Sequence, residues 1–360
     1  MKVKLGDLTK IRTGKLDANA STDDGAYPFF TCSREPLKIS SYSYDCECVL
    51  VAGNGDLNVK YYNGKFDAYQ RTYIIEAKQP DVLYMPYLYY FMEKYIVELR
   101  KLAIGGVIKY IKLGNLTDAL IELPSYNQQR SLVERLEKVK SSIDKRNEQL
   151  EKLDELVKCH FVELFGDPIL NEKKWITKPV KELTTKVGSG ATPKGGDSSY
   201  KDSGISLIRS LNVHNNIFST KELAHIDNEQ ANQLSNVTIQ SGDVLLNITG
   251  ASVARCCIVP DDILPARVNQ HVCIIRCNDM LNPLFLERLL TSDNYQTYLW
   301  NVAEGGGGTR QALTKQQIEN FSIITPPITL QTTFATFVSR IDKLRVIGKR
   351  SIIYETGWQS

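Results

Sequence analysis

The sequence lacks the segments that place a protein in or across a membrane. Its first residues, from Met1 to Leu5, contain no apolar run of the kind found in a signal peptide, and no later stretch is apolar over the length of a membrane span. Hydrophobic residues make up 42% of the 360 residues and charged residues 24%, which is typical of a globular protein. The sequence therefore predicts a soluble protein of the cytoplasm.

The motifs of common enzymes and metal sites are also missing. There is no phosphate-binding loop of the form G-x-x-x-x-G-K-[ST], and no G-x-G-x-x-G follows a predicted strand. None of the eight cysteines belongs to a C-x-x-C pair, and the four histidines are scattered. These absences argue against a nucleotide-binding enzyme and against a zinc site, so we expect this chain to carry no cofactor and no metal.

A strong excess of positive charge is absent as well. The formal net charge is +3, residues 1–124 carry 16 basic and 15 acidic side chains, and residues 166–326 carry 15 and 16. Such a balance of charge does not by itself indicate a nucleic-acid partner. Any surface that binds DNA must therefore be a local patch on the protein.

The most prominent pattern that is present is an apolar repeat between Pro124 and Gly166. Its steps alternate between four and three residues, and this period of 3.5 indicates a helix packed along its length on another helix. Ser125 is a helix-start signal, and Gly166 followed by Pro168 is a stop signal. At 1.5 Å per residue the helix would be about 60 Å long. The predicted seam consists of Leu132, Leu136, Val139, Ile143, Leu150, Leu153, Val157 and Leu164, and only Arg146 and His160 interrupt its apolar character.

The segments before and after this helix repeat one another. Landmarks of the first segment recur in the second at a separation that grows from 176 to 202 residues, as loop insertions would produce. The matched pairs include Gly14 with Gly190, Leu50 with Leu245, Gly55 with Gly250, Lys60 with Arg255, Gln70 with Gln270, Lys109 with Gln311, and Gln129 with Gln331. The chain is therefore predicted to contain two copies of one unit.

A second helical seam follows the second copy. It consists of Leu330, Phe334, Phe337, Ile341 and Leu344, and the apolar pattern stops at the next seam position, Gly348. Two such helices in one chain pair most simply with each other, in antiparallel orientation. The sequence thus predicts an α/β fold with two duplicated strand-rich domains, 1–124 and 166–326, separated by long coiled-coil helices over 125–165 and, shortened, over 327–360.

One alternative is a Mg²⁺-dependent restriction-type nuclease. Such enzymes hold Mg²⁺ with an acid and an E-x-K on a neighbouring strand, and the candidates here are Asp67, Glu76 and Lys78. The second copy has arginine or asparagine at the three matching positions, which argues against a catalytic role for these residues. A coiled-coil adaptor that binds only proteins is a further alternative.

Polar side chains of the kinds that contact DNA recur at matching places in the two copies. Arginine and lysine bind phosphate or guanine edges, and asparagine and glutamine pair with adenine. Matched positions with changed side chains are expected of two readers of different half-sites, and equally of drift after duplication. The predicted DNA-binding residues are Arg12, Lys15, Lys60, Gln70, Lys109 and Tyr110 in the first copy, and Thr192, Lys194, Arg255, Asn269, Gln270, Arg310 and Gln311 in the second.

Four motifs stand in a fixed order: the helix entrance LPSYNQQR (123–130), the helix exit ELFGDP (163–168), GATP (190–193) and Asn269-Gln270. In these motifs and in its duplicated plan the chain resembles the specificity (S) subunit of Type I restriction–modification systems. The resemblance implies two target-recognition domains that read a bipartite double-stranded DNA target, with helices that set the unread spacer, and no catalysis by this subunit. It also implies docking of two methyltransferase (M) subunits, which carry S-adenosylmethionine, and of restriction (R) subunits through them.

Overall fold

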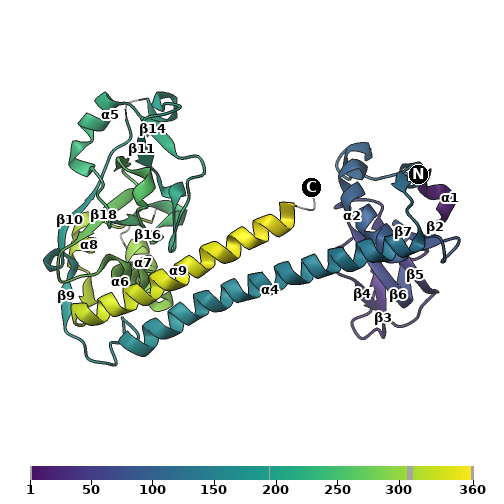
Figure 1. The fold of residues 1–360 in the computed structure, drawn as a ribbon, viewed down its shortest axis with the longest axis horizontal. Helices are drawn as coiled ribbons and strands as arrows, with labels where there is room; N and C mark the ends of the chain where they lie inside the picture. Colours follow the sequence, from purple (N-terminus) through teal and green to yellow (C-terminus); the bar gives the residue numbers. More distant parts are fainter. Residues whose placement is uncertain (1, 194, 306–310, 358–360) are drawn as a thin grey trace. The chain divides into compact units, whose positions relative to one another are not determined.

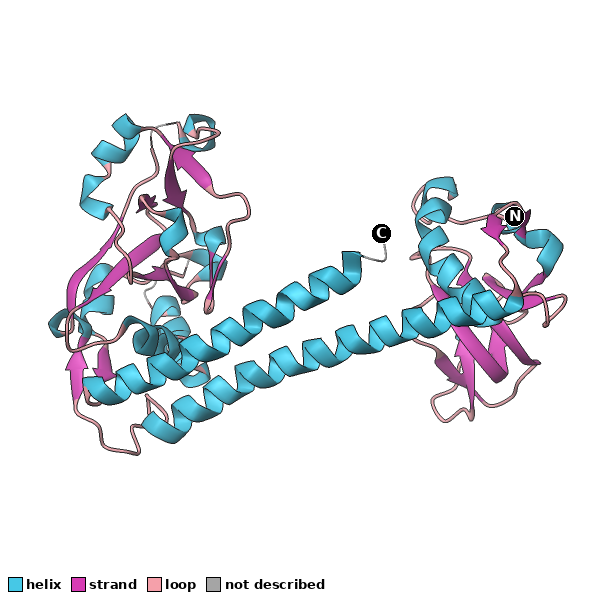
Figure 2. Cartoon of the chain, viewed as in Figure 1, coloured by secondary structure: helices cyan, strands magenta, loops and turns pink. Residues whose placement is uncertain are grey.

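The structure, a computed structural model, describes residues 2–193, 195–305 and 311–357, together with the side chains of nearly all of them. The chain divides into two compact units, residues 1–145 and 146–360. The helix α4 (Tyr126–Phe165) contributes its first half to the first unit and its second half to the second. Figure 1 and Figure 2 show the elements of each unit.

The first unit is built on one large sheet. The six strands lie in the order β2-β7-β5-β6-β3-β4, and neighbours are antiparallel except for the parallel pair β3 and β6. The strands β1 and β8 form a separate two-stranded antiparallel sheet. The strands are β1 (Lys2–Lys4), β2 (Thr9–Thr13), β3 (Tyr27–Phe30), β4 (Leu37–Ile39), β5 (Tyr44–Ala52), β6 (Val59–Ala68), β7 (Thr72–Ala77) and β8 (Leu120–Glu122). The helices besides α4 are α1 (Leu5–Leu8), α2 (Met85–Leu102) and α3 (Leu113–Thr117).

Alternation along the central strand β5 explains the two cores of this unit. Val49 and Val51 belong to a buried cluster that also holds Leu88 and Met92 of α2. Leu50, between them in sequence, belongs to a different cluster on the opposite face. Because successive side chains of a strand point to opposite faces, a continuous apolar run fills both cores at once.

The second unit repeats this plan with more strands. Its largest described sheet has the order β10-β18-β15-β16, and a three-stranded sheet has the order β14-β11-β17. The strands are β9 (Thr177–Pro179), β10 (Thr184–Ser189), β11 (Ile205–Ile208), β12 (Val213–His214), β13 (Ile217–Phe218), β14 (Ala224–Ile226), β15 (Val244–Asn247), β16 (Cys256–Ile258), β17 (Ala266–Val268), β18 (Val272–Cys277) and β19 (Ser322–Ile324). The helices are α5 (Asn228–Gln233), α6 (Pro283–Leu290), α7 (Asp293–Glu304), α8 (Lys315–Asn320) and α9 (Ile328–Gly357).

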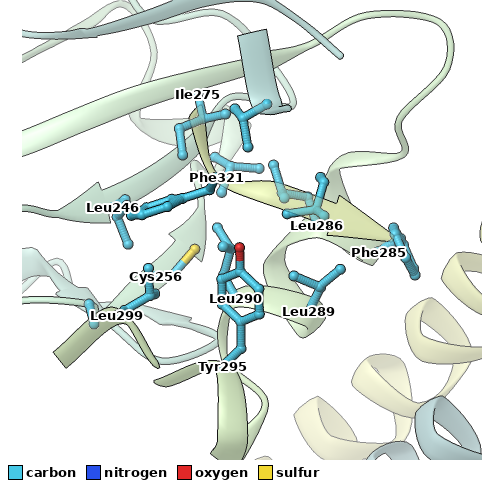
Figure 3. Close-up of a cluster of buried hydrophobic side chains, with 14 of the residues drawn as sticks. Leu246, Cys256, Ile275, Phe285, Leu286, Leu289, Leu290, Tyr295, Leu299 and Phe321 are labelled. Atoms are coloured by element: carbon cyan, nitrogen blue, oxygen red, sulfur yellow. The ribbon is translucent and has the colours of Figure 1, made fainter. Parts of the chain in front are cut away.

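The sheet of the second unit is again covered on both faces. Ile275 of β18 lies in the cluster formed with α6, α7 and the long helices, while Ile274 lies in the other cluster. Figure 3 shows part of the first cluster, in which Leu286, Leu290 and Tyr295 lie in one group with the sheet residues Leu246 and Ile275. The neighbouring pair Ile74 and Ile75 of β7 is divided between two clusters in the same way.

Close backbone approaches at two matched glycines support the predicted duplication. A Cβ built on Gly14 would lie 2.0 Å from the carbonyl oxygen of Ala68, and one built on Gly190 would lie 1.8 Å from that of Val268. Only glycine fits such a contact. Both pairs occupy the same place in the two copies.

A buried glutamine at the start of each long helix also supports the predicted duplication. Gln129 accepts a hydrogen bond from the Tyr84 backbone N–H (2.9 Å) and donates to the carbonyls of Val82 (2.8 Å) and Pro124 (3.0 Å).

Gln331 makes the same three bonds in the second unit. It accepts from the Asn282 N–H (2.8 Å) and donates to the carbonyls of Met280 (3.2 Å) and Pro326 (2.8 Å). Both glutamine side chains are fully buried. The two long helices therefore begin with the same hydrogen-bonded arrangement around a buried glutamine.

Within the second unit, α9 and the second half of α4 pack side by side and antiparallel. Leu150 lies at Gly348, where an added Cβ would be 3.2 Å from its Cδ2. His160 lies at Phe337, with ring centroids 4.4 Å apart. As the number on α4 rises, the number on α9 falls, which is the predicted antiparallel pairing.

Two predicted seam residues are exposed, and residues outside the predicted seam, Phe161 and Val338 among them, are buried. Leu132 is 41% exposed while Val133 is buried, and Leu344 is 51% exposed while Arg345 is largely covered by ion pairs with acidic residues of both helices. Buried seam residues are Val157, Phe334 and Ile341, and half-buried ones are Leu136, Val139, Ile143, Leu150, Leu153, Leu164, Leu330 and Phe337.

The second helix is longer than its apolar pattern indicated. Gly348 occupies a buried seam position but does not end the helix, which continues to Gly357 and has 30 residues against 40 for α4. Glycine is tolerated there because it allows close approach of Leu150. No helix in the described part of the chain has the length and apolar character to cross a membrane.

Candidate nucleic-acid interface

Two loops of each unit are held together by the same backbone hydrogen bonds. The Gly55 N–H donates to the carbonyl of Lys109 at 2.9 Å, and the Gly250 N–H donates to the carbonyl of Gln311 at 2.9 Å. The predicted match of Lys109 with Gln311 is therefore a match in space. Lys109 in one unit and Gln311 in the other therefore occupy equivalent positions. We call these hydrogen-bonded loops the loop frame of each unit.

A second bond of this frame identifies another matched pair. The Gly53 N–H donates to the carbonyl of Arg71 at 2.8 Å, and the Ile248 N–H donates to the carbonyl of His271 at 3.0 Å. Arg71 and His271 each follow the matched glutamine of their unit. The sequence-based selection missed both residues, although their place beside the glutamines was a signal that could have found them.

Strand register corrects one predicted match. Leu50 pairs with Lys60, whereas its equivalent Leu245 pairs with Cys257. Lys60 thus corresponds to Cys257 and not to Arg255. The reason is that the β15–β16 connection has eight residues and the β5–β6 connection six, and Arg255 lies in the longer one.

In the second unit two predicted residues line one open concavity of about 590 Å³. Arg255 and Gln311 are among its lining residues, and so is His271. The guanidinium of Arg255 forms no hydrogen bond or ion pair with any residue that the structure describes, so this cation is available to a ligand. The other lining residues are Ser210, Leu211, Thr249, Gly250, Ala251, Ser252 and Ala312.

A chain of side-chain hydrogen bonds runs along one edge of the concavity. Thr192 Oγ1 donates to Gln270 Oε1, and Gln270 Nε2 lies 3.1 Å from His271 Nε2. His271 Nδ1 lies 2.6 Å from Thr249 Oγ1. The structure therefore links Thr192 and Gln270, through hydrogen bonds, to His271, which lines the concavity together with Arg255 and Gln311.

Asn269 does not belong to this surface. Its side chain is 5% exposed, and its Oδ1 accepts a hydrogen bond from the backbone N–H of His271 at 3.0 Å. The residue forms the turn that presents Gln270 to solvent, because an asparagine side chain readily bonds the backbone two residues on. Its predicted role as a DNA contact is therefore corrected to a structural one. Lys194 and Arg310 lie outside the described residues.

In the first unit two of the six predicted residues are engaged by other parts of the protein. Arg12 forms an ion pair with Glu76 at 2.7 Å and lies over the ring of Tyr44, so its charge is already neutralised within the sheet. Lys60 is half-buried and donates to Asn58 Oδ1, and burial lowers the pKa of its ammonium group.

The remaining predicted residues of this unit are accessible. Lys15, Gln70, Lys109 and Tyr110 are exposed. Gln70 Nε2 donates to Asp17 Oδ1 at 2.7 Å, so this amide is held on one side only. The accessible set is more basic than its counterpart in the second unit, where glutamine and histidine stand at the matched positions of Lys109 and Arg71.

The nuclease arrangement is not formed. Asp67 is buried and accepts hydrogen bonds from Ser43 Oγ (2.6 Å) and from the Ala68 N–H (2.8 Å). Glu76 is occupied by Arg12, as described above. The strand β5 separates β6, which carries Asp67, from β7, which carries Glu76.

Lys78 also has a structural role, since its Nζ donates to the carbonyls of Gly6 (2.9 Å) and Asp7 (3.3 Å). The three residues therefore do not converge on a common point. Within the described residues no group of three or more His, Cys, Asp or Glu is placed to hold a metal ion.

A family model described as the Type I restriction modification DNA specificity domain matches residues 1–155 and 172–353. The chain belongs to this family. The two matched segments of this specificity-domain protein contain the two loop frames described above, and the predicted duplication and family resemblance are confirmed.

Curated relatives of this specificity-domain protein include two subunits from Escherichia coli. It is 40% identical over 156 residues to the EcoDI specificity subunit, a match that covers 43% of this chain and 34% of the relative. It is 24% identical over 328 residues to the EcoBI specificity subunit, covering 83% of this chain and 66% of the relative. The matches thus span one third and just under two thirds of the relatives' lengths.

Solved structures share the fold at low sequence identity. The chain matches the S subunit of the Type I restriction–modification system from M. genitalium with a TM-score of 0.66 and 14% identity, over 99% of this chain and 92% of that one. It matches a chain from a structure of complex assembly and conformational transition in the type I R-M system with a TM-score of 0.59 and 16% identity, over 99% and 95%. The predicted α/β fold with paired long helices is the fold of these proteins.

Proposed function

We propose that this chain is the DNA-specificity subunit of a Type I restriction–modification complex and reads a bipartite double-stranded target. The observation that carries the proposal is the duplicated loop frame. Its backbone hydrogen bonds are the same in both units, while its side chains differ: Arg71 and Lys109 in the first, His271 and Gln311 in the second. A conserved frame with changed donors and acceptors suits two readers of different base sequences.

The partners follow from the family. We infer that two methyltransferase subunits, which supply S-adenosylmethionine, bind this chain, that restriction subunits join through them, and that the complex acts in the cytoplasm. The continuous helix α4 and its partner α9 support a role of the helices in setting the unread spacer of the target. This chain would then need no cofactor of its own.

Replacing Arg255 by alanine should weaken DNA binding about tenfold. It should also reduce the slope of log affinity against log salt concentration by about one, because one fewer counterion is released. The reason is that its guanidinium is unpaired within the described structure and lines the concavity. Measurement of the affinity at several salt concentrations tests this prediction. We also expect the variant to change only one half of the recognised target, which mapping of the recognised sequence tests. Lys152→Ala, which removes an exposed cation on α4, is the matched control. A simultaneous change in both halves would contradict the two-reader proposal.

Duplex DNA should remain intact when the purified chain is incubated with it and Mg²⁺. The candidate acids Asp67 and Glu76 are occupied by protein partners, so we infer that the chain is non-catalytic. Gel electrophoresis after incubation measures the outcome. Cleavage that disappears in an Asp67→Asn variant would establish a nuclease in place of this assignment.

A further inference from the structure

We propose that Gln270 reads an adenine in the half-site bound by the second unit, and that Thr192 and His271 are positioning residues that hold its amide for this purpose. The inference rests on the proposed function, since it assumes that the concavity of the second unit faces DNA. It goes further because it assigns one base to one side chain.

The hydrogen-bond chain fixes which atoms donate. An amide nitrogen can only donate, so His271 Nε2 must accept from Gln270 Nε2. The ring proton of the neutral histidine therefore lies on Nδ1, where it is donated to Thr249 Oγ1 at 2.6 Å. On the other side of the amide, the Thr192 hydroxyl donates to Gln270 Oε1.

The same chain leaves one donor and one acceptor of Gln270 unused. The amide nitrogen has two hydrogens and gives one to His271, and the carbonyl oxygen has two lone pairs and gives one to Thr192. The side chain as a whole is exposed. One N–H and one oxygen lone pair on the same amide are the combination that binds N7 and the N6 amino group of adenine in the major groove.

Holding an exposed glutamine in one orientation also reduces the conformational entropy that the side chain loses on binding DNA. A free glutamine side chain loses rotamer freedom when it binds, and it can present its oxygen and nitrogen in either order. Here Thr192, from a distant part of the chain, and the adjacent His271 fix that order before DNA arrives. The arrangement is pre-organised for one base.

The first unit lacks this arrangement at the matched place. Gln70 is held only by Asp17, and Arg71 replaces the histidine. An exposed arginine is the usual bidentate partner of guanine. The assignment of adenine therefore applies to the second unit alone.

The test is selection of bound targets from a library of random bipartite duplexes by the full-length chain together with the subunits that co-purify with it, followed by sequencing. The wild type should select adenine at one position of one half-site. Gln270→Glu keeps the side-chain length and the acceptor for Thr192 but has no donor for N7 of adenine. It should lose the adenine preference at that position about tenfold or more and favour the cytosine amino group there.

Two matched variants separate reading from folding. Thr192→Val removes the hydroxyl and should weaken the preference at the same position, whereas Thr192→Ser keeps the hydroxyl and should preserve it. Gln70→Glu should leave this position unchanged and act only on the other half-site.

The outcomes separate the two levels of the proposal. If Gln270→Glu binds DNA with an unaltered selected base at every position, the adenine assignment is overturned while the proposed function stands. If the wild-type assembly selects no sequence at all, the proposed function fails and the assignment fails with it.

Discussion

Phe165→Ala should destabilise the second unit by about 3–5 kcal/mol, the usual cost of truncating a fully buried phenylalanine. Phe165 is fully buried where α4 ends. Its ring centroid lies 4.7 Å from that of Phe285 on α6, 5.4 Å from that of Phe334 on α9 and 5.1 Å from that of Phe161. Removal of the ring leaves a cavity at the point where both long helices join the body of this unit.

Hydrogen exchange measured by peptide together with urea unfolding tests this prediction. Exchange should rise along α9 near Phe334 and along α6, and the unfolding transition of the second unit should move to lower urea. Leu156→Ala, at an exposed position of the same helix, should change stability by less than about 0.5 kcal/mol. An unchanged exchange pattern in α9 would show that the aromatic cluster does not attach the helix pair.

Gln331→Leu should cost about 3 kcal/mol or more in the second unit. The fully buried amide satisfies the Asn282 N–H and the carbonyls of Met280 and Pro326, and leucine of similar size satisfies none of them. Each buried backbone group left without a partner costs about 1–3 kcal/mol. Exchange at Asn282 and at the start of α9 should accelerate, because the entrance of the helix is held by these bonds.

The matched variant Gln129→Leu provides the reciprocal control. It removes the same three hydrogen bonds at the entrance of α4, to Tyr84, Val82 and Pro124. Each substitution should affect exchange in its own unit and leave the other unchanged. Equal effects of either variant on both units would contradict the division into two independently packed copies.

Local sequence signals determined much of the fold. The 3.5-residue period and the terminal signals placed the first long helix almost to the residue, since it runs from Tyr126, directly after Ser125, to Phe165, directly before Gly166. Gly166 has a φ of 72° and its N–H bonds the Val162 carbonyl, as a C-terminal cap does. These features depend only on neighbours within a few residues, so the sequence encodes them directly.

Matching residues between the two copies located part of the candidate interface. Gln70 with Gln270 and Lys109 with Gln311 occupy equivalent places in the structure. The match of Lys60 with Arg255 was wrong because a two-residue insertion lies between the landmarks, and only strand register reveals on which side of it a residue falls.

The sequence by itself determined the doubled plan, the long helix and the family. The tertiary structure alone decided which polar groups are free: Arg12 is neutralised by Glu76, Asn269 is buried in a turn, and Arg255 is unpaired among the described residues. It also decided that Thr192 and His271, nearly eighty residues apart, hold the same amide. The physical reason is that such roles depend on contacts between segments distant in the chain, and periodicity and spacing carry no information about those contacts.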